Sequence, residues 1–236
     1  MSILEIQGLE SGYGEVQILW GIDLTLEAGR LTSLVGANGV GKTTMLRTVM
    51  GSLRPWSGSI KFEGQEVGQM PAHRKPDLGL VLVPEGRQLF TSMNVVENLE
   101  MGATNSRARQ RFPQNVEKVF RLFPRLEERQ QQVAATLSGG EQQMLAVARG
   151  LMAEPKVLMF DELSLGLAPN LVLSIFETLK KLKAEGLTML LIEQNVHLAL
   201  SVSDYAYVLS EGRVTLEGKA EKVAADKSVQ QAYLGL

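Results

Sequence analysis

The segment Gly36–Thr44, with the sequence Gly-Ala-Asn-Gly-Val-Gly-Lys-Thr-Thr, constrains the fold more than any other part of the chain. It matches the pattern G-x-x-x-x-G-K-[ST], and it lies between an apolar run, Leu31–Val35, and a predicted helix, Thr44–Met50. Glycines let a backbone curl around a phosphate, and the positive end of the following helix dipole faces the same point. The segment therefore predicts a phosphate-binding loop between a strand and a helix.

The polar residues of this loop have predicted roles toward a nucleotide. Lys42 would bridge the β- and γ-phosphates, and Thr43 would give its hydroxyl oxygen to Mg²⁺, which prefers a few oxygen ligands beside nucleotide phosphates. A chance glycine turn is a poor explanation, because the pattern arises in about one chain in a hundred at average composition. The nucleotide-binding residues predicted here are Gly36, Asn38, Gly39, Gly41, Lys42, Thr43 and Thr44.

Two carboxylates follow a second apolar run. Val157–Phe160 leads directly into Asp161 and Glu162, which a parallel sheet would leave at the carboxyl end of a buried strand. In phosphate-loop chemistry the Asp holds Mg²⁺, and an adjacent Glu polarises the attacking water as general base. Together with Lys42 and Thr43, this pair predicts a site that hydrolyses a nucleotide.

The apolar runs predict an α/β fold. Several are apolar at consecutive positions, which is typical of parallel strands covered on both faces by helices. The clearest amphipathic helix is 170–185, which ends before Gly186 and whose apolar stripe indicates core packing. The predicted strands are Ile3–Gln7, Ile22–Glu27, Leu31–Val35, Ser59–Glu63, Leu80–Val83, Val157–Phe160, Thr188–Ile192 and Tyr205–Leu209.

From about Thr91 onward the strand pattern gives way to polar, helical sequence. The length of 236 residues exceeds the usual size of one domain and falls short of two, so we expect one core with an insertion. We place the nucleotide-binding core at 1–84 and 151–236, and a helical subdomain at 85–150.

Composition excludes several classes of protein. The chain has no Cys, which removes disulfides, thiolate metal sites and thiol nucleophiles. Its net charge of −2 gives no global field for nucleic acid, and the basic cluster 107–111 has no interleaved aromatic residues, which favours a solvated helix face. No signal peptide precedes the first strand, and the apolar runs are far shorter than the roughly 20 residues that cross a bilayer. We expect a cytoplasmic protein that reaches a membrane only through a partner.

A second glycine motif, 137–143 with the sequence Leu-Ser-Gly-Gly-Glu-Gln-Gln, precedes another predicted helix at 144–152. Ser138 is a good N-cap, and the amides of Gly139 and Gly140 would open a second anion-binding helix end. Lying between the phosphate loop and the Asp-Glu pair, this motif resembles the signature of ATP-binding cassette (ABC) ATPases. The resemblance covers essentially the whole chain.

The resemblance implies a P-loop NTPase (RecA-like) core with an antiparallel β subdomain and an inserted helical subdomain. It also implies a head-to-tail dimer, in which the signature of each chain caps the ATP on the phosphate loop of the other. Tyr13 resembles the aromatic residue that stacks on adenine in such proteins, although an exposed turn tyrosine needs no ligand. The signature residues implied to contact ATP are Ser138, Gly139, Gly140 and Glu141.

Some positions depart from the common pattern of the family. Glu85 occupies a loop where most relatives have Gln, and from there it would contact Mg²⁺ or water. Gln194 lies where a switch His usually contacts the γ-phosphate; its amide can donate that hydrogen bond but cannot carry a proton. Leu163 replaces the usual Pro after the Asp-Glu pair. We assign no role to His73 or His197.

Three loops narrow the resemblance: Val-Pro-Glu-Gly-Arg at 83–87, Ser-Leu-Gly-Leu-Ala-Pro at 164–169, which lacks the Asp common there, and Glu-Gln-Asn at 193–195. With Ala-Tyr-Leu-Gly at 232–235, they look like one of the two ATPase subunits of bacterial high-affinity branched-chain amino acid importers. Such a subunit uses ATP and Mg²⁺ at the cytoplasmic face of the inner membrane. It moves two permease subunits, depends indirectly on a periplasmic binding protein, and pairs with itself or with the sibling ATPase.

Other functions stay open as alternatives. A sibling subunit serves urea and short-chain amide importers, and an exporter ATPase differs only in the loops just quoted. ABC-type ATPases that act on nucleic acid or the ribosome usually carry long coiled-coil insertions or paired cassettes. Neither sustained heptads nor a second phosphate loop is present in this sequence. A non-catalytic nucleotide sensor is disfavoured by the intact Glu162.

Overall fold

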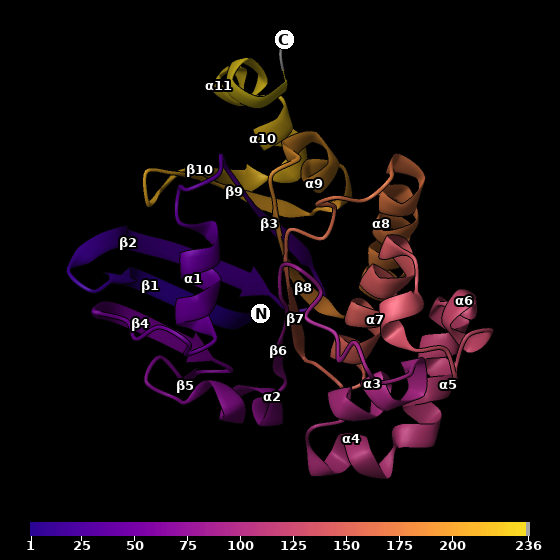
Figure 1. Cartoon of the computed structure of the whole chain (residues 1–236). Coiled ribbons are helices and arrows are strands. Elements are labelled where there is room, and N and C mark those ends of the chain that lie inside the picture. Colours follow the sequence, from indigo (N-terminus) through magenta and orange to yellow (C-terminus); the bar gives the residue numbers. More distant parts are fainter. Residues whose placement is uncertain (235–236) are drawn as a thin grey trace.

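The computed structural model describes residues 1–234, which form two β-sheets surrounded by helices (Figure 1). One sheet has six strands in the order β10-β9-β3-β8-β7-β6, and the other has four in the order β2-β1-β4-β5. The strands are β1 (Ser2–Tyr13), β2 (Val16–Glu27), β3 (Leu31–Val35), β4 (Ser57–Phe62), β5 (Gln65–Glu66), β6 (Leu80–Val83), β7 (Val157–Asp161), β8 (Thr188–Glu193), β9 (Tyr205–Ser210) and β10 (Arg213–Lys219).

Most helices lie between β6 and β7 or after β7, and the insertion between those two strands contains α3 to α7. The helices are α1 (Lys42–Val49), α2 (Lys75–Leu78), α3 (Val95–Gly102), α4 (Ser106–Gln110), α5 (Phe112–Leu122), α6 (Pro124–Glu127), α7 (Gly139–Leu151), α8 (Pro169–Ala184), α9 (Val196–Val202), α10 (Ala220–Ala224) and α11 (Lys227–Val229), with short helical turns at Ala72–Arg74, Ala134–Thr136 and Gln230–Leu234. No helix among residues 1–234 is both long enough and apolar enough to cross a bilayer.

The centre of the six-stranded sheet is parallel and buried. Every residue of β3, β7 and β8 is buried, and β8 pairs in parallel with β3 on one side and β7 on the other. Successive side chains face opposite sides, so Met159 joins one core cluster while Phe160 joins the other. This burial on both faces explains why these strands are apolar at consecutive positions.

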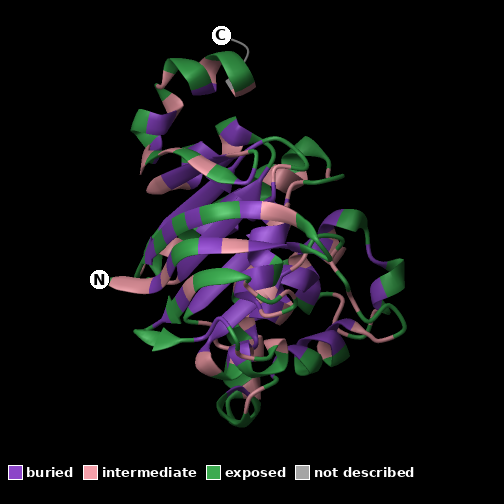
Figure 2. Cartoon of the chain, turned by 90° about the vertical axis from the view of Figure 1, so that its left-hand side faces the viewer, coloured by how far each residue is buried: buried purple, intermediate pink, exposed green. Residues whose placement is uncertain are grey.

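Different elements cover the two faces of this sheet. On one face, the antiparallel sheet and α1 form a core that contains Leu46 and Val49. On the other face, α7, α8 and α9 supply residues such as Leu145 and Leu179. Figure 1 shows the antiparallel strands on one side of the core sheet and the inserted helices on the other. Figure 2, which faces the antiparallel sheet, shows exposed and buried residues alternating along its strands.

The two ends of α1 are built differently. Its N-terminal end lies at the phosphate loop, whereas its C-terminal end is held by Lys75, whose ammonium donates to the carbonyl oxygen of Val49. The Lys75 side chain is fully buried, and burial lowers its pKa to about 8, against the nearby charge of Glu66, which raises it. The last turn of α1 therefore contacts a buried ammonium group.

The predicted α/β fold, with an antiparallel sheet and inserted helices, is confirmed. The predicted helix at 170–185 is also confirmed: α8 ends at Ala184 and is followed by Gly186 with φ of 86°. The N–H groups of Gly186 and Leu187 bond back to the carbonyls of Lys183 and Leu182. Of the segment 232–235, Gly235 lies outside the described residues.

Several predicted bounds are wrong. The strands 3–7 and 22–27 are only parts of β1 and β2, which have 12 residues each, and Tyr13 ends β1 instead of following it in a turn. Register shifts around Gly8 and Gly12 interrupt the alternation that would have revealed their full length. The strand β10 was missed because it is half exposed, with polar residues at alternate positions.

Two predicted helix starts are also wrong. Helix α1 begins at Lys42 and α7 at Gly139, each earlier than predicted, because the motif residues themselves form the first turn. Both glycine motifs therefore belong partly to the helices that follow them.

Candidate nucleotide-binding site

The phosphate loop joins β3 to α1 at the carboxyl edge of the core sheet. Gly41 is the N-cap of α1 with φ of 110°, and no side chain caps the helix. A side chain at Gly36 would collide with the carbonyl oxygen of Leu209, so the loop can pass this strand only with glycine there. Because the first N–H groups of a helix have no intrahelical acceptor, this uncapped end can accept an anion.

The Lys42 ammonium lies at the mouth of this loop. The side chain is only 4% exposed, and Nζ donates to the carbonyl oxygens of Gly36 at 2.8 Å and Ala37 at 2.9 Å. The same Nζ is 3.7 Å from Oε1 of Glu162. The loop and the acidic pair thus hold one buried cation between them, in the position where phosphate oxygens would meet it.

The acidic pair lies beside Thr43. Asp161 is the last residue of β7 and is buried, and its Oδ1 accepts a hydrogen bond from Oγ1 of Thr43 at 3.3 Å. Burial, followed by the charge of Glu162, raises the pKa of Asp161 to about 6, against the hydrogen bond from Thr43. The charge of Glu85, in the exposed loop after β6, adds to this rise. This crowding of carboxylates beside a hydroxyl favours a bound cation.

The donor set fits Mg²⁺. Thr43 and Asp161 offer a hydroxyl and a carboxylate oxygen, and Mg²⁺ typically takes one or two protein oxygens alongside substrate phosphates and water. No group of three or more His, Cys, Asp or Glu side chains in residues 1–234 is placed to hold a metal ion by itself. The site therefore suits a metal that arrives with a nucleotide.

The strand order brings Gln194 to the same place. Because β8 lies between β3 and β7, the residue after β8 lies between the phosphate loop and the acidic pair. Its Oε1 accepts a hydrogen bond from Nδ2 of Asn38 at 3.3 Å. The predicted residues that the structure gathers at this edge are Gly36, Asn38, Gly39, Gly41, Lys42, Thr43, Thr44, Asp161, Glu162 and Gln194, with Glu85 nearby.

Sequence reasoning missed Glu193, the last residue of β8. It is 1% exposed and accepts hydrogen bonds from the backbone N–H and the hydroxyl of Ser164, at 2.9 Å and 2.7 Å. Burial raises the pKa of this carboxyl, and the bonds from Ser164 oppose the rise. Glu193 fixes the loop that follows the acidic pair. The pattern that revealed Asp161, a carboxylate at the end of a buried apolar strand, could also have revealed Glu193.

Tyr13 lies at the edge of this region, at the end of β1. Its side chain is 41% exposed, and its hydroxyl accepts a hydrogen bond from Nη1 of Arg47 at 3.1 Å. Arg47 lies in the last turn of α1 and was not predicted. The pair leaves an aromatic side chain accessible beside the helix that carries Lys42.

The signature motif at the start of α7 differs from the phosphate loop in that a side chain caps its helix. Ser138 caps α7 in a reciprocal capping box with Glu141, whose N–H donates to Oγ of Ser138 at 3.4 Å and whose carboxylate accepts from the Ser138 N–H at 2.9 Å. The Glu141 carboxylate also pairs with Arg129 at 2.6 Å. Within residues 1–234, no hydrogen bond or ion pair joins Ser138, Gly139, Gly140 or Glu141 to the phosphate loop.

Arg87 fixes the other side of the signature. From the loop after β6, its guanidinium donates to Oε1 of Gln142 at 2.8 Å and to Oε1 of Gln143 at 3.3 Å. A side chain at Gly139 would contact this guanidinium, and one at Gly140 would collide with Leu171. No local pattern around Arg87 predicts this role.

Comparison with known proteins places the chain in one family. Residues 19–164, more than half of the chain, match the sequence profile of the ABC transporter family. A high-affinity branched-chain amino acid transport ATP-binding protein of Pseudomonas aeruginosa is 42% identical over 233 residues, covering 99% of this chain and 100% of that protein. A probable branched-chain amino acid transport ATP-binding protein of Archaeoglobus fulgidus is 35% identical, covering 97% of each chain. The crystal structure of an ABC transporter cassette in its ADP conformation superposes with a TM-score of 0.86 and 29% identity over the whole of both chains.

Proposed function

Since the chain belongs to the ABC transporter family of ATP-binding ATPases, we propose that it powers an importer of branched-chain amino acids. One observation carries the substrate class: the 42% identity to a branched-chain amino acid transport subunit extends over nearly the entire length of both chains. The aligned region therefore spans any surface that would meet other subunits as well as the ATP site. We place the protein at the cytoplasmic face of the membrane, where it would meet integral permease subunits.

The roles of the site residues follow from their positions. Lys42 would hold the β- and γ-phosphates, since its ammonium is already oriented by the loop carbonyls. Thr43 and Asp161 would hold Mg²⁺, which neutralises charge on the phosphates when bound. Glu162 would orient and deprotonate the attacking water, and Gln194 would donate its amide hydrogen bond to the γ-phosphate. Tyr13 would stack on the adenine ring.

The position of the signature supports a dimer. Ser138 and its neighbours form no contact with the phosphate loop of their own chain, so they would serve an ATP molecule bound to a second subunit. That subunit would be another copy or a sibling ATPase. We treat 85–150 as a helical subdomain that would move relative to the core, 1–84 and 151–236, when the two subunits close on ATP.

A hollow beside this subdomain is suited to a permease. Exposed Phe90 and Met101 line a cavity of about 330 Å³ between β6, α3 and α7. The Arg149 guanidinium lies over the Phe90 ring, 5.4 Å from its centre. Large exposed apolar side chains at a concave surface are typical of a docking site for another protein.

The test of the proposed function is labelled leucine uptake by cells that lack this protein, complemented with wild type or Lys42→Ala. Loss of uptake that only wild type restores is the expected result. Labelled urea is the control substrate. Unchanged leucine uptake would contradict the proposal, and a selective loss of urea uptake would move the assignment to an amide importer.

Glu162→Gln should lower the ATP hydrolysis rate by about a hundredfold or more, because the water loses its general base. ATP binding should persist, so the variant should accumulate as an ATP-dependent dimer, detected by light scattering with saturating ATP and Mg²⁺. The matched control is Glu221→Gln, an exposed position on α10. A Glu162→Gln variant that stays monomeric under these conditions would contradict the composite site.

A further inference from the structure

The loop after β6 contains three successive residues with left-handed backbone angles. Their φ angles are 74° at Gly86, 65° at Arg87 and 46° at Gln88. The N–H of Gln88 donates to the carbonyl oxygen of Gly86 at 2.6 Å, as in a γ-turn centred on Arg87. A γ-turn with positive φ at its central residue is rare and strained, and a residue with a side chain keeps such angles only where other contacts hold it. This loop therefore needs contacts from outside to keep its path.

Those contacts come from α7, and they hold both the side chain and the backbone of Arg87. The Arg87 guanidinium donates to Oε1 of Gln142 at 2.8 Å and to Oε1 of Gln143 at 3.3 Å. Nη2 of Arg149, near the other end of the same helix, donates to the Arg87 carbonyl oxygen at 3.2 Å. The strained turn is thus fastened to one helix at three points.

The partners of the Arg87 guanidinium are neutral and fixed in orientation. Nε2 of Gln142 donates to the carbonyl oxygen of Ala134 at 3.1 Å, which leaves Oε1 as the acceptor for Arg87. Gln143 is 4% exposed. In the part of the chain that the structure describes, no carboxylate forms an ion pair with Arg87. The planar fork of the guanidinium, which reaches both amides, therefore holds this contact by its geometry.

Arg87 lies between residues that the proposed function assigns to two different ATP molecules. Glu85 is two residues earlier, and its charge contributes to the raised pKa of Asp161 at the phosphate loop of the same chain. On the other side, a Cβ atom at Gly139 would lie 3.3 Å from Nη2 of Arg87, so the guanidinium packs against the first residue of α7. One residue therefore contacts the signature motif and forms the turn that follows Glu85.

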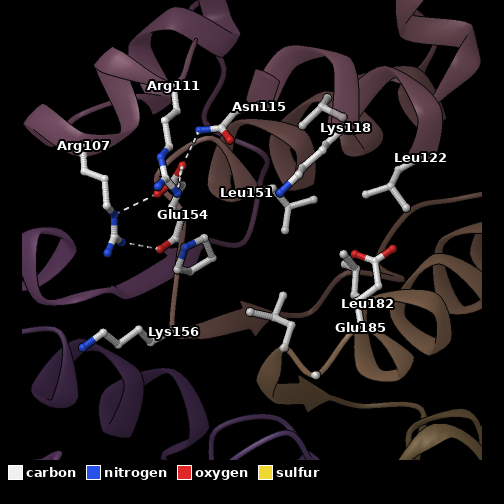
Figure 3. Close-up of a pocket in the computed structure, with 14 residues that line it drawn as sticks. Arg107, Arg111, Asn115, Lys118, Leu122, Leu151, Glu154, Lys156, Leu182 and Glu185 are labelled. Atoms are coloured by element: carbon white, nitrogen blue, oxygen red, sulfur yellow. Dashed lines mark hydrogen bonds and ion pairs between the residues drawn. The ribbon is translucent and has the colours of Figure 1, made fainter. Parts of the chain in front are cut away.

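The far end of α7 is joined to the rest of the helical insertion. Just after the helix, the Glu154 carboxylate accepts hydrogen bonds from Nε of Arg107 at 2.8 Å and from Nδ2 of Asn115 at 3.0 Å. Figure 3 shows these side chains meeting at one wall of a hollow of about 460 Å³. A movement of α7 would therefore involve α4 and α5 as well as the turn that Arg87 forms.

We propose that Arg87 is a positioning residue that links the Glu85 loop to the signature motif of the same chain. With the link in place, the two parts keep one relative position, so a nucleotide on the phosphate loop affects the signature that this chain offers to a second subunit. Without the link, the strained turn relaxes and the two parts move independently. The inference rests on the composite site of the proposed function, because only there do the two parts serve different ATP molecules.

Hydrogen exchange of the isolated chain tests the link without catalysis. In Arg87→Met, the amides of 86–89 should exchange about tenfold faster, because the turn loses the contacts of its side chain. ADP with Mg²⁺ should slow exchange at 137–143 in wild type and not in Arg87→Met. Exchange at 188–193, in the buried strand β8, should be the same in both and would show that the variant is folded. Arg74→Met, at an exposed position, is the control and should behave as wild type.

The kinetics of ATP hydrolysis give a second readout. Arg87→Met should lower kcat about tenfold and leave KM for ATP within about twofold, because the phosphate loop with Lys42 is intact. Arg87→Lys keeps the charge but cannot reach both amides, so it should not restore kcat. Gln142→Met should reproduce the loss, and the double variant Arg87→Met/Gln142→Met should lose no more than either single variant. Gln110→Met, at an exposed position on α4, is the matched control.

Several results would each overturn the proposal. They are unchanged exchange at 86–89 or unchanged kcat in Arg87→Met, an equal effect of ADP on 137–143 in wild type and variant, and full restoration of kcat by Arg87→Lys. None of these results would bear on leucine uptake by the wild-type chain, so the proposed function would stand without the link. Conversely, a chain that shows the link and does not support leucine uptake would keep the role of Arg87 and lose the assigned substrate.

Discussion

The starts of α1 and α7 look alike in sequence, because each follows a glycine-rich motif, but the structure builds them differently. Helix α1 has Gly41 as its N-cap, no side-chain cap, no acidic residue in its first turn, and a buried Lys42. Helix α7 has Ser138 as its N-cap and a first-turn Glu141 that closes a capping box. The first helix end is open to an anion, and the second is partly satisfied from within.

This difference shows that a helix dipole alone does not make a phosphate site. At α7 the Glu141 carboxylate already accepts the N–H of Ser138 and adds a negative charge to the helix end, and Arg129 compensates that charge at 2.6 Å. At α1 the ammonium of Lys42 adds to the dipole. One chain alone should therefore bind ATP at α1, and α7 should contribute only when a second subunit presents its nucleotide.

The largest expected effect concerns the N-terminal end of α1, which has no side-chain cap. Lys42→Ala should weaken ATP binding to the isolated chain by about a hundredfold or more, because charge-assisted hydrogen bonds to two phosphates are lost. Titration with a fluorescent ATP analogue would measure this. Lys222→Ala, at an exposed position on α10, is the control. Unchanged affinity in Lys42→Ala would remove the main difference between the two helix ends.

The next effect concerns the other end of α1. Burial lowers the pKa of Lys75 to about 8 from the ordinary value of 10.5, so between these values the unfolded chain binds more protons than the folded one. The wild-type free energy of unfolding should therefore rise, relative to Lys75→Met, as pH increases from about 8 to 10.5, by up to about 3 kcal/mol. Below pH 8 the difference between the two proteins should not change with pH. Urea unfolding at several pH values would measure it.

The control for this pH dependence is Lys222→Met, whose unfolding curve should shift with pH as the wild-type curve does. Parallel pH profiles for wild type and Lys75→Met would mean that the buried ammonium does not bear on α1 stability.

The smallest expected effect concerns the N-terminal end of α7, which the capping box of Ser138 and Glu141 closes. Ser138→Ala should lower the free energy of unfolding by about 1 kcal/mol through loss of the N-cap, and should leave ATP binding by the isolated chain unchanged. Ser174→Ala, at an exposed position on α8, should cost less. If Ser138→Ala reduced single-chain ATP affinity as much as Lys42→Ala, the two helix ends would be equivalent after all.

The sequence predicted the buried parallel strands best. The runs 31–35 and 80–83 coincide with β3 and β6, because strands covered on both faces have a continuous apolar pattern. The antiparallel sheet was less predictable, since bulges at its glycines break the alternation in β1 and β2. The motif at 36–44 indicated the geometry around Lys42 because only glycine permits that backbone path.

Other features depended on contacts that no local pattern encodes. The Lys75 ammonium meets the carbonyl of Val49, 26 residues earlier in the chain, and Ser164 meets Glu193 across 29 residues. Arg87 reaches Gln142 over 55 residues. Each partner is an ordinary polar residue in sequence, and only the packing of the strands and helices brings it into range.

The helix α7 has a further thermodynamic consequence, because its first turn carries the signature motif and its last residue lines a hollow of about 460 Å³ in front of β7 and β8. Its 13 residues, about 20 Å in length, begin at Gly139 and end at Leu151, which lines that hollow. If α7 shifts as one rigid rod between two positions, ligands at its two ends act on the same equilibrium. Linkage then requires reciprocity: whatever factor a ligand at the Leu151 end applies to nucleotide affinity at the signature end, the nucleotide applies to the affinity for that ligand.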